Sequence, residues 1–331
     1  MIKKILLLLL FFLLLTGCVT TAPEIASDFT GKEESSFHTE EPQPDIMAET
    51  EPTVTATEPI ATTTKTTTTT TTAATTSVFG NAENGENEII RGENFCLLTL
   101  RRPLSEEELD ILSGVNDIEI SLHEPVDLSV LARFAPLEYL RIECDPTSEP
   151  FEIIGVSELL CADIEIIYIG GSGSHLLDLS GAQNGKTSLF HIWDVVLKTD
   201  SSTSLPSLNQ ISATSVKLES KEPFLPFANA KEVYIRDCTL DDINTIRVFS
   251  KVEKLTLFDG NTSELNVLQD FPCLSEIALF GSPPQICSID ALKDLPAIEK
   301  IHYGHTCFTE EEEALLKEWY PDCDLHVLYG L

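Results

Sequence analysis

The hydrophobic pattern of this chain repeats along about its last 240 residues. A six-position unit, apolar-x-x-apolar-x-apolar, returns at intervals of about 17 to 27 residues, most often 22 to 24. Its clearest copies begin at Val115, Leu137, Ile164, Val252, Leu274 and Ile298. Each unit predicts a short strand whose first, fourth and sixth side chains point into the core, while the others point outward. A period of this length indicates a solenoid, in which each repeat buries its apolar face only against its neighbours.

A second pattern, with a period of three, connects the strand units. In residues 128–137, 265–274 and 289–298 every third residue is apolar. Side chains three apart eclipse in a 3₁₀ helix, so these segments predict short 3₁₀ or irregular helical returns. A proline stands just before the next strand unit in each case, where it stops a helix. We therefore expect the strands to stack as one parallel sheet.

The fourth position of each unit sets the expected register of this sheet. Along the chain it is occupied by Leu98, Ile118, Leu140, Ile167, either Phe190 or Ile192, Val216, Val233, Leu255, Ile277, Ile301 and Leu325. The spacing becomes irregular in residues 172–223, where several glycines intrude. We interpret that range as a decayed repeat or an inserted loop.

The end of the chain carries the signals of a closing helix. Thr309 and Glu312 have the spacing of a capping box, and four consecutive glutamates favour the positive end of a helix dipole. Leu315, Leu316 and Trp319 give the predicted helix an apolar face, and Pro321 stops it. Leu325 and Val327 predict a last strand. Solenoids need such a unit so that the final repeat does not expose its core.

These features resemble the leucine-rich repeat family, particularly its short-repeat, internalin-like bacterial type. The repeat from Ala230 through Val233, Ile235 and Cys238 to Leu240 matches the family pattern, with Cys238 in the Asn/Cys position. The resemblance covers most of residues 95–331, although most repeats lack the Asn. It implies an α/β solenoid: a leucine-rich repeat with a parallel concave sheet, short 3₁₀ or irregular returns and a C-terminal capping helix.

The first residues have the order of an export signal. Lys3 and Lys4 precede an apolar run, Ile5 to Leu15, which is shorter than the roughly 20 residues of a membrane-spanning helix. The following Thr-Gly-Cys18 resembles the lipobox of bacterial lipoproteins. The resemblance implies that residues 1–17 are a signal peptide. It also implies that Cys18 is lipidated and holds the protein on the outer side of the cell membrane. The alternative is an ordinary secreted protein with an incidental cysteine.

Residues 18–92 lack apolar periodicity. Twelve of the fifteen residues from Thr62 to Thr76 are threonine, and proline and glutamate are frequent nearby. Such a composition buries too little apolar surface to offset chain entropy, so we expect a disordered stalk. Residues 93–331 are expected to form the repeat domain.

Eight cysteines remain besides Cys18, an even number that permits disulfides in an exported domain. Several fall at repeat positions that are usually buried, which favours core thiols, with Cys307 and Cys323 as the pair best placed to bridge. His302-x-x-His305-x-Cys307 offers too few converging ligands for zinc. We expect no metal, no cofactor and no catalytic residue.

The concave face is the expected binding surface. Outward positions of the C-terminal strands place Tyr234, Arg236, Thr256, Phe258, Phe280 and His302 near one another. Exposed aromatic residues beside a charge are typical of interaction patches. A covering helix or loop, or a one-residue slip in register, would remove this surface.

The formal net charge of −33 argues against nucleic-acid binding. We expect a lipid-anchored, non-catalytic module that recognises a protein or a surface glycan and meets the membrane through Cys18 only. Two alternatives stay open. One is a structural or adhesive envelope component that acts by self-association. The other is an enzyme with a site near His175 and His191 in the irregular range.

Overall fold

The computed structural model describes residues 77–80, 85–183, 185–238, 243–258, 265–281, 289–305 and 307–328. The chain divides into two units, Met1–Thr72 and Ala73–Leu331, and the described residues all belong to the second. The expected signal peptide, Cys18 and most of the expected stalk therefore lie outside the described residues. None of the helices in the described part is both long and apolar enough to cross a membrane.

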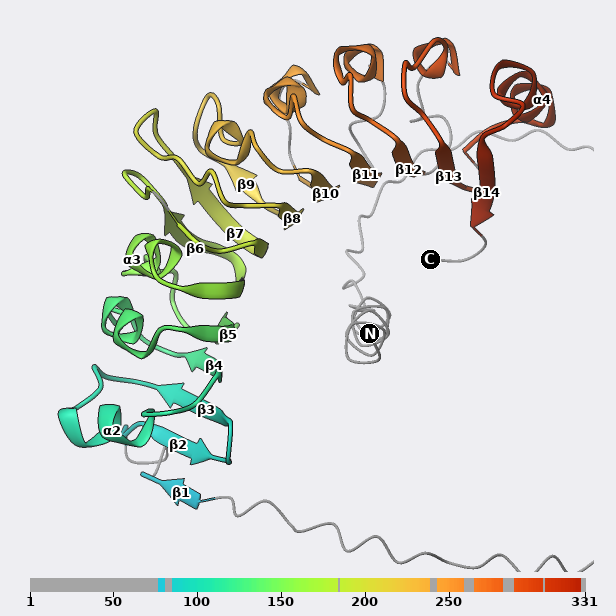
Figure 1. Ribbon diagram of the computed structural model, residues 1–331. Helices are drawn as coiled ribbons and strands as arrows, with labels where there is room; N and C mark the ends of the chain where they lie inside the picture. Colours follow the sequence, from blue (N-terminus) through green and yellow to red (C-terminus); the bar gives the residue numbers. More distant parts are fainter. Residues whose placement is uncertain are drawn as a thin grey trace, which may run out of the picture. The chain divides into compact units, whose positions relative to one another are not determined.

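A 14-stranded sheet runs through the described residues and lines the inner side of an arc (Figure 1). Its strands are β1 (Ser77–Phe79), β2 (Glu88–Arg91), β3 (Phe95–Leu100), β4 (Asp117–Leu122), β5 (Leu137–Cys144), β6 (Ile164–Asp178), β7 (Leu189–Lys198), β8 (Gln210–Thr214), β9 (Lys217–Leu218), β10 (Glu232–Arg236), β11 (Lys254–Phe258), β12 (Glu276–Phe280), β13 (Lys300–Gly304) and β14 (Asp324–Leu328). From β3 onward all pairings are parallel and follow chain order, apart from β9, which pairs with β7. The expected parallel-sheet solenoid is confirmed.

Short helical segments lie on the outer side of the arc (Figure 1). They are the α-helices α2 (Glu106–Ile111), α3 (Val156–Cys161) and α4 (Glu310–Trp319), and the 3₁₀ helices η2 (Ser129–Phe134), η3 (Leu225–Phe227), η4 (Ile243–Val248), η5 (Leu265–Asp270) and η6 (Ile289–Leu292). The period of three correctly predicted η2, η5 and η6. Leu131, Leu268 and Leu292 are fully buried there, because every third side chain of a 3₁₀ helix points to the same side.

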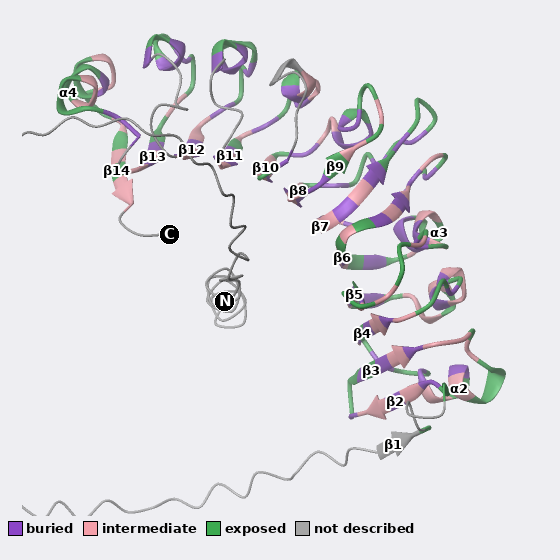
Figure 2. Cartoon of the chain, turned by 180° about the vertical axis from the view of Figure 1, so that it is seen from behind, coloured by how far each residue is buried: buried purple, intermediate pink, exposed green. Residues whose placement is uncertain are grey.

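The core lies between the sheet and the helical returns, where buried residues alternate along most of the parallel strands (Figure 2). Ile118, Leu140, Ile167, Ile277 and Ile301 have no exposed surface and occupy one register position in their strands. Burying an aliphatic side chain stabilises a fold by roughly 1.5–3 kcal/mol. Each repeat thus depends on its two neighbours for most of its stability.

The observed register corrects two of the expected fourth positions. Ile118 lies opposite Cys96, not Leu98, and the residue between Phe190 and Val233 is Ile211, not Val216. Cys96 and Leu98 both point inward, so alternation alone cannot separate registers that differ by two residues. Val216 lies past the end of β8, beyond Ser215, whose positive φ of 53° interrupts the strand.

Residues 172–223 are neither a decayed repeat nor an inserted loop on the concave side. The ladder passes without a gap through Ile167, Phe190, Ile211 and Val233. The irregular spacing arises because β6 and β7 continue beyond the ladder and pair again after a register shift between Gly170 and His175. The returns here are extended strands instead of 3₁₀ helices.

The folded unit also begins earlier than residue 93. β1 pairs antiparallel with β2, and β2 pairs antiparallel with β3. Ile89 of β2 is 1% exposed, so this hairpin covers the core of the first repeat. The expectation of a disordered stalk to residue 92 is therefore wrong for β1 and β2. A single strand of four residues is too short to show a period, which is why the sequence did not indicate it.

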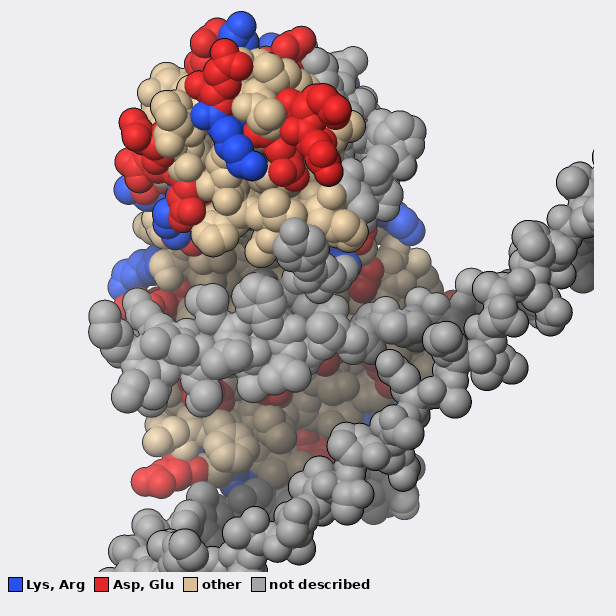
Figure 3. All heavy atoms as spheres, turned by 90° about the vertical axis from the view of Figure 1, so that its right-hand side faces the viewer, with Lys and Arg blue, Asp and Glu red and all other residues tan. Residues whose placement is uncertain are grey.

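At the other end, the predicted capping helix is present as α4. Thr309 Oγ1 accepts from the Glu312 N–H at 3.2 Å, and the Glu312 carboxylate accepts from the Thr309 N–H at 2.8 Å. Leu316 is fully buried, but Leu315 is 39% exposed and lies off the expected apolar face. The space-filling view toward this end of the repeat unit shows abundant acidic side chains (Figure 3).

The cysteines follow the expected core pattern in part. Cys96, Cys144, Cys238 and Cys307 are buried. Cys323 is a free thiol, so the bridge to Cys307 that the sequence suggested is not formed. Cys287 lies outside the described residues. These thiols pack as small apolar groups, and burial raises the pKa of Cys144 to about 12.

Candidate binding surface on the concave face

The parallel register arranges outward side chains in rows across the sheet. One row runs through Leu97, Glu119, Arg141, Tyr168, His191, Ser212, Tyr234, Thr256, Ala278, His302 and His326. A second row, two residues further along each strand, runs through Thr99, Ser121, Glu143, Gly170, Trp193, Thr214, Arg236, Phe258 and Phe280. Neighbours in such a row are about 4.8 Å apart, so their side chains touch.

The structure brings four of the sequence-predicted residues together: Tyr234, Arg236, Phe258 and Phe280, called the C-terminal cluster below. The rings of Phe258 and Phe280 stack at 4.2 Å with an angle of 15° between their planes. Tyr234 lies 5.3 Å from Phe258, and the Arg236 guanidinium lies 5.2 Å from the Phe258 ring centre. All four side chains are partly exposed.

The other two predicted residues are placed differently. Thr256 lies between Tyr234 and Ala278 in the first row, so it borders the C-terminal cluster. His302 lies beyond Ala278 and stacks on His326 at 5.4 Å, with Glu276 at 3.7 Å. It therefore forms part of a separate histidine pair near the C-terminal edge of the sheet.

A second aromatic group was not predicted as a site. Tyr139, Arg141, Tyr168, His191 and Trp193, called the N-terminal cluster below, occupy β5, β6 and β7. Tyr168 lies 5.3 Å from both Tyr139 and His191, and His191 lies 5.3 Å from Trp193 in an edge-on arrangement. The Arg141 guanidinium lies 5.6 Å from the Trp193 ring. The signal for this cluster was present in the sequence. Placing Phe190 at the fourth position puts His191 and Trp193 in the two outward rows.

Gly170 provides the space that Trp193 occupies. A Cβ atom at position 170 would lie 2.1 Å from the Trp193 ring. Gly170 is directly beside Trp193 in the second row, so the indole lies across the backbone of β6. A larger residue here would force the ring away from Arg141. The glycine therefore fixes the shape of the N-terminal cluster.

Burial sets the charge of the N-terminal cluster. It lowers the pKa of His191 to about 4, and the nearby Arg141 charge acts in the same direction. Burial also raises the pKa of Tyr139 to about 12. At neutral pH the two rings are uncharged, and the cation of the cluster is Arg141, whose Nε donates to Glu143 at 2.9 Å. The cluster thus presents polar, neutral rings beside one ion pair.

Small side chains separate the two clusters on β8. Ser212 and Thr214 stand between His191 and Tyr234 and between Trp193 and Arg236, respectively. The Ser212 hydroxyl is buried and has no hydrogen-bond partner in the structure. The aromatic side chains of the two clusters are therefore separated by one strand with small side chains.

Ser121, His123 and Asp145 have the connectivity of a nucleophile, a base and an acid. Ser121 Oγ is 3.4 Å from His123 Nε2, and His123 Nδ1 is 2.6 Å from Asp145 Oδ2. A hydrolase also needs donors aimed at an oxyanion. The backbone N–H groups of β4 are instead committed to pairing with β3 and β5. Asp145 also accepts from Thr147 in a turn. We interpret the series as a structural network at the strand ends.

Within the described ranges, no group of three or more His, Cys, Asp or Glu side chains is arranged to hold a metal ion. His302 and His305 therefore have no companion ligands there that would complete a zinc site. His175, considered above for an enzyme site, is fully buried and its Nδ1 accepts from the Phe151 N–H.

No family model and no curated protein matches this sequence. Among solved structures, an internalin (inlF) from Listeria monocytogenes is similar, with a TM-score of 0.43 and 12% identity, covering 71% of this chain and 82% of that one. Internalin C2 (inlC2) from the same organism has a TM-score of 0.38 and 16% identity, covering 62% of this chain and 80% of that one. The solenoid fold itself is established by the strand register described above.

Proposed function

We propose that this chain is a lipid-anchored binding module at the cell surface, and that it recognises a protein through the two aromatic clusters of its concave face. The observation that carries the proposal is the partly exposed aromatic band formed by Tyr139, Tyr168, Trp193, Phe258 and Phe280. Trp, Tyr and Arg dominate the binding energy of protein interfaces. Each cluster supplies at least one of these three residue types.

The packing of the rings favours a protein over a glycan. Phe258 and Phe280 cover each other's faces, because they stack at 4.2 Å. What they present to a partner is ring edge, which carries the positive side of the quadrupole and attracts carbonyl oxygens and the faces of other aromatic rings. A sugar ring stacks on an open aromatic face, and the Phe258–Phe280 pair offers few open faces. Apolar and aromatic side chains of a protein suit such a surface better.

The protein or glycan nature of the partner is tested with surface extracts of host and neighbouring cells. The full-length chain is used as bait beside Phe258→Ala/Phe280→Ala, with Leu315→Ala on the exposed side of α4 as the matched control. We expect capture by wild type and the control but not by the double variant. Protease treatment of the extract should abolish capture, and periodate oxidation of glycans should not. The reverse sensitivity would assign a glycan partner.

The same experiment separates binding from self-association. A structural or adhesive component would capture a tagged second copy of its own chain in the absence of any extract. A partner captured equally by wild type and Phe258→Ala/Phe280→Ala would move the site away from the C-terminal cluster.

The anchor is a separate part of the proposal, supported by the Leu15–Cys18 sequence. A lipidated Cys18 would carry acyl chains whose buried methylenes contribute about 0.8 kcal/mol each. Cells expressing the chain are fed an alkyne analogue of palmitate. We expect wild type to be labelled and to sediment with membranes, and Cys18→Ala to do neither. Label that persists in Cys18→Ala would contradict the assignment.

A further inference from the structure

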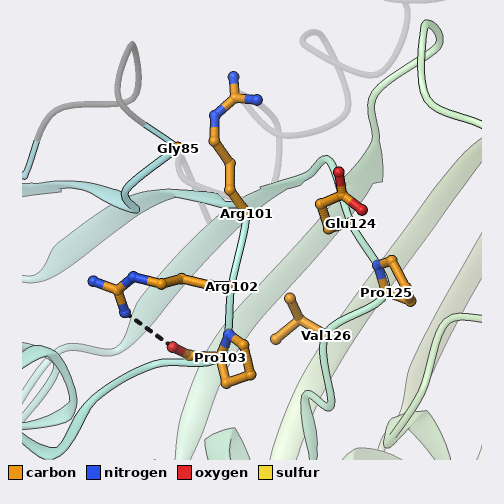
Figure 4. A pocket seen from close by; sticks show the side chains of 7 residues that line it. All are labelled: Gly85, Arg101, Arg102, Pro103, Glu124, Pro125 and Val126. Atoms are coloured by element: carbon orange, nitrogen blue, oxygen red, sulfur yellow. Dashed lines mark hydrogen bonds between the residues drawn. The ribbon is translucent and has the colours of Figure 1, made fainter.

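A pocket of about 370 Å³ lies just beyond the ends of β3 and β4. Arg101, Arg102 and Pro103 line it from the first strand, and Glu124, Pro125 and Val126 line it from the second. Figure 4 shows the side chains of Arg101 and Glu124 extending to the same side, above the two prolines and Val126. The pocket thus combines a cation, an anion and an apolar floor.

The two arginines of the pocket differ in their partners. Arg102 is paired with Glu86 at 2.6 Å and with Glu108 at 2.9 Å, and it donates to the Pro103 carbonyl (Figure 4). Among the lysines and arginines that the structure describes, only Arg101 and the exposed Lys221 have side chains without a hydrogen bond, ion pair or ring contact. In so acidic a chain, a partly buried arginine without a carboxylate partner is unexpected.

Two donors beside this pocket are buried and have no acceptor. They are Arg101 Nε and Asn87 Nδ2. Asn87 is 1% exposed, and its Oδ1 accepts from the backbone N–H groups of Arg101 at 2.9 Å and Arg102 at 3.2 Å. Asn87 therefore holds the backbone of both arginines in place. A buried donor without an acceptor is destabilising, so Arg101, which lines the pocket, favours a ligand that brings oxygen.

The surrounding charges limit that ligand to one negative charge. Glu124 lines the same pocket, and Asp145 lies within the field of Arg101. Asp145 itself is occupied by Thr147 and by His123 at 2.6 Å. A dianion such as sulfate would be repelled by both carboxylates. A carboxylate brings one charge, and its two oxygens match the planar fork of a guanidinium.

We propose that Arg101 is the anchor of a carboxylate-binding pocket at the rim of the concave face, with the floor of Pro103, Pro125 and Val126 receiving the carbon atoms that carry the carboxylate. The inference rests on the proposed function in one respect, the assignment of the carboxylate to a protein. The carboxylate belongs either to an acidic side chain or to a chain end. The pocket itself does not depend on the aromatic clusters.

The test uses the full-length chain with ¹⁵N-labelled arginine. Its seven arginines give a small set of Nε–H signals. The Arg101 signal is the one missing from Arg101→Gln. Sodium acetate is titrated at constant ionic strength, and we expect this signal alone to move and to saturate. Arg133, exposed and 3.5 Å from Glu106, is the matched control through Arg133→Gln. An Arg101 signal that moves no more than that of Arg133 would overturn the proposal.

Two further arms make the result specific. Arg101→Lys keeps the charge but loses the fork, so acetate affinity should fall about ten- to hundredfold while the fold is kept. Sulfate should bind more weakly than acetate, and tighter sulfate binding would refute a monoanion site. Acetyl-Ala-Ala with a free end and acetyl-Glu-amide then separate a chain end from a side chain. If acetate binds but neither peptide does, the protein source of the carboxylate is refuted, while the aromatic-band proposal stands.

Discussion

The two aromatic clusters share one ladder geometry but present different chemistry. The C-terminal cluster exposes bare phenyl edges, with Phe258 and Phe280 stacked at 4.2 Å. The N-terminal cluster exposes Tyr, His and Trp rings, which carry polar atoms, and it depends on Gly170 for space. The first is suited to burial of apolar area, and the second to directional hydrogen bonds. One repeated scaffold can therefore place affinity and specificity on separate strands.

The largest expected effect comes from removing the phenyl pair. Phe258→Ala/Phe280→Ala should weaken partner binding by about 4 kcal/mol, close to a thousandfold in Kd, if both residues are hot spots of about 2 kcal/mol each. Binding is measured by titration of the captured partner. Thermal unfolding of the variant should change little, because both rings lie on the surface of the sheet. A Kd within a factor of three of wild type would remove the C-terminal cluster from the site.

Low pH should destabilise the folded N-terminal cluster more than the C-terminal cluster. The pKa of His191 is about 4 in the folded chain and about 6.5 when unfolded, so only the unfolded chain takes up this proton between those values. Stability present above pH 6.5 should be lost as the pH falls to 4, by up to about 3 kcal/mol. Burial also lowers the pKa of His175, which adds to the loss.

Urea unfolding at several pH values measures this effect. His191→Gln should remove its share of the loss, whereas His326→Gln, at an exposed position of β14, should keep it. Equal pH dependence in wild type and His191→Gln would show that His191 is not the responsible group.

Gly170→Ala should disturb one cluster and spare the other. The added Cβ would overlap the Trp193 ring, and overpacking of this kind costs typically about 2 kcal/mol. We expect a change in indole fluorescence and a lower free energy of unfolding. Ser121→Ala, in the same row two strands away, is the control. An unchanged indole signal would mean that Trp193 does not depend on position 170.

The smallest expected effects on binding come from replacing Arg141 or Arg236. Each lies over a ring, and losing such a contact costs about 1 kcal/mol, roughly fivefold in Kd. Arg141→Gln should also raise the pKa of His191, because the Arg141 charge is one cause of its low value. Arg236→Gln should leave the pH profile of stability unchanged. Identical profiles for the two variants would contradict this assignment.

The sequence predicted the strands, the 3₁₀ returns and the capping helix because each has its own local signal. It did not predict the register at Cys96, since side-chain alternation is unchanged by a shift of two residues. At β8 it placed Val216 where Ile211 lies, because the spacing of the repeats is irregular in that range. The C-terminal cluster was found because its repeats are regular. The N-terminal cluster was missed because the choice between Phe190 and Ile192 was left open, so no residue of β7 was assigned to the outward rows.

Sequence spacing also could not indicate the pocket at Arg101. Arg101 stands out only because it lacks a carboxylate partner. Arg102, the next residue, is paired with Glu86 and Glu108. Both acids are distant from Arg102 in sequence or on another element. Only the folded arrangement distinguishes the two arginines.

The most direct test of the concave-face account is a double-mutant comparison of Trp193→Ala, Phe258→Ala and the combined variant, with Leu315→Ala as reference. The dissociation constant for the captured partner is measured for each. If both clusters contact one protein, each single change should weaken binding at least tenfold, and the two effects should add, because the rings lie several strands apart. If neither single variant binds more weakly than Leu315→Ala, the aromatic band is not the recognition surface.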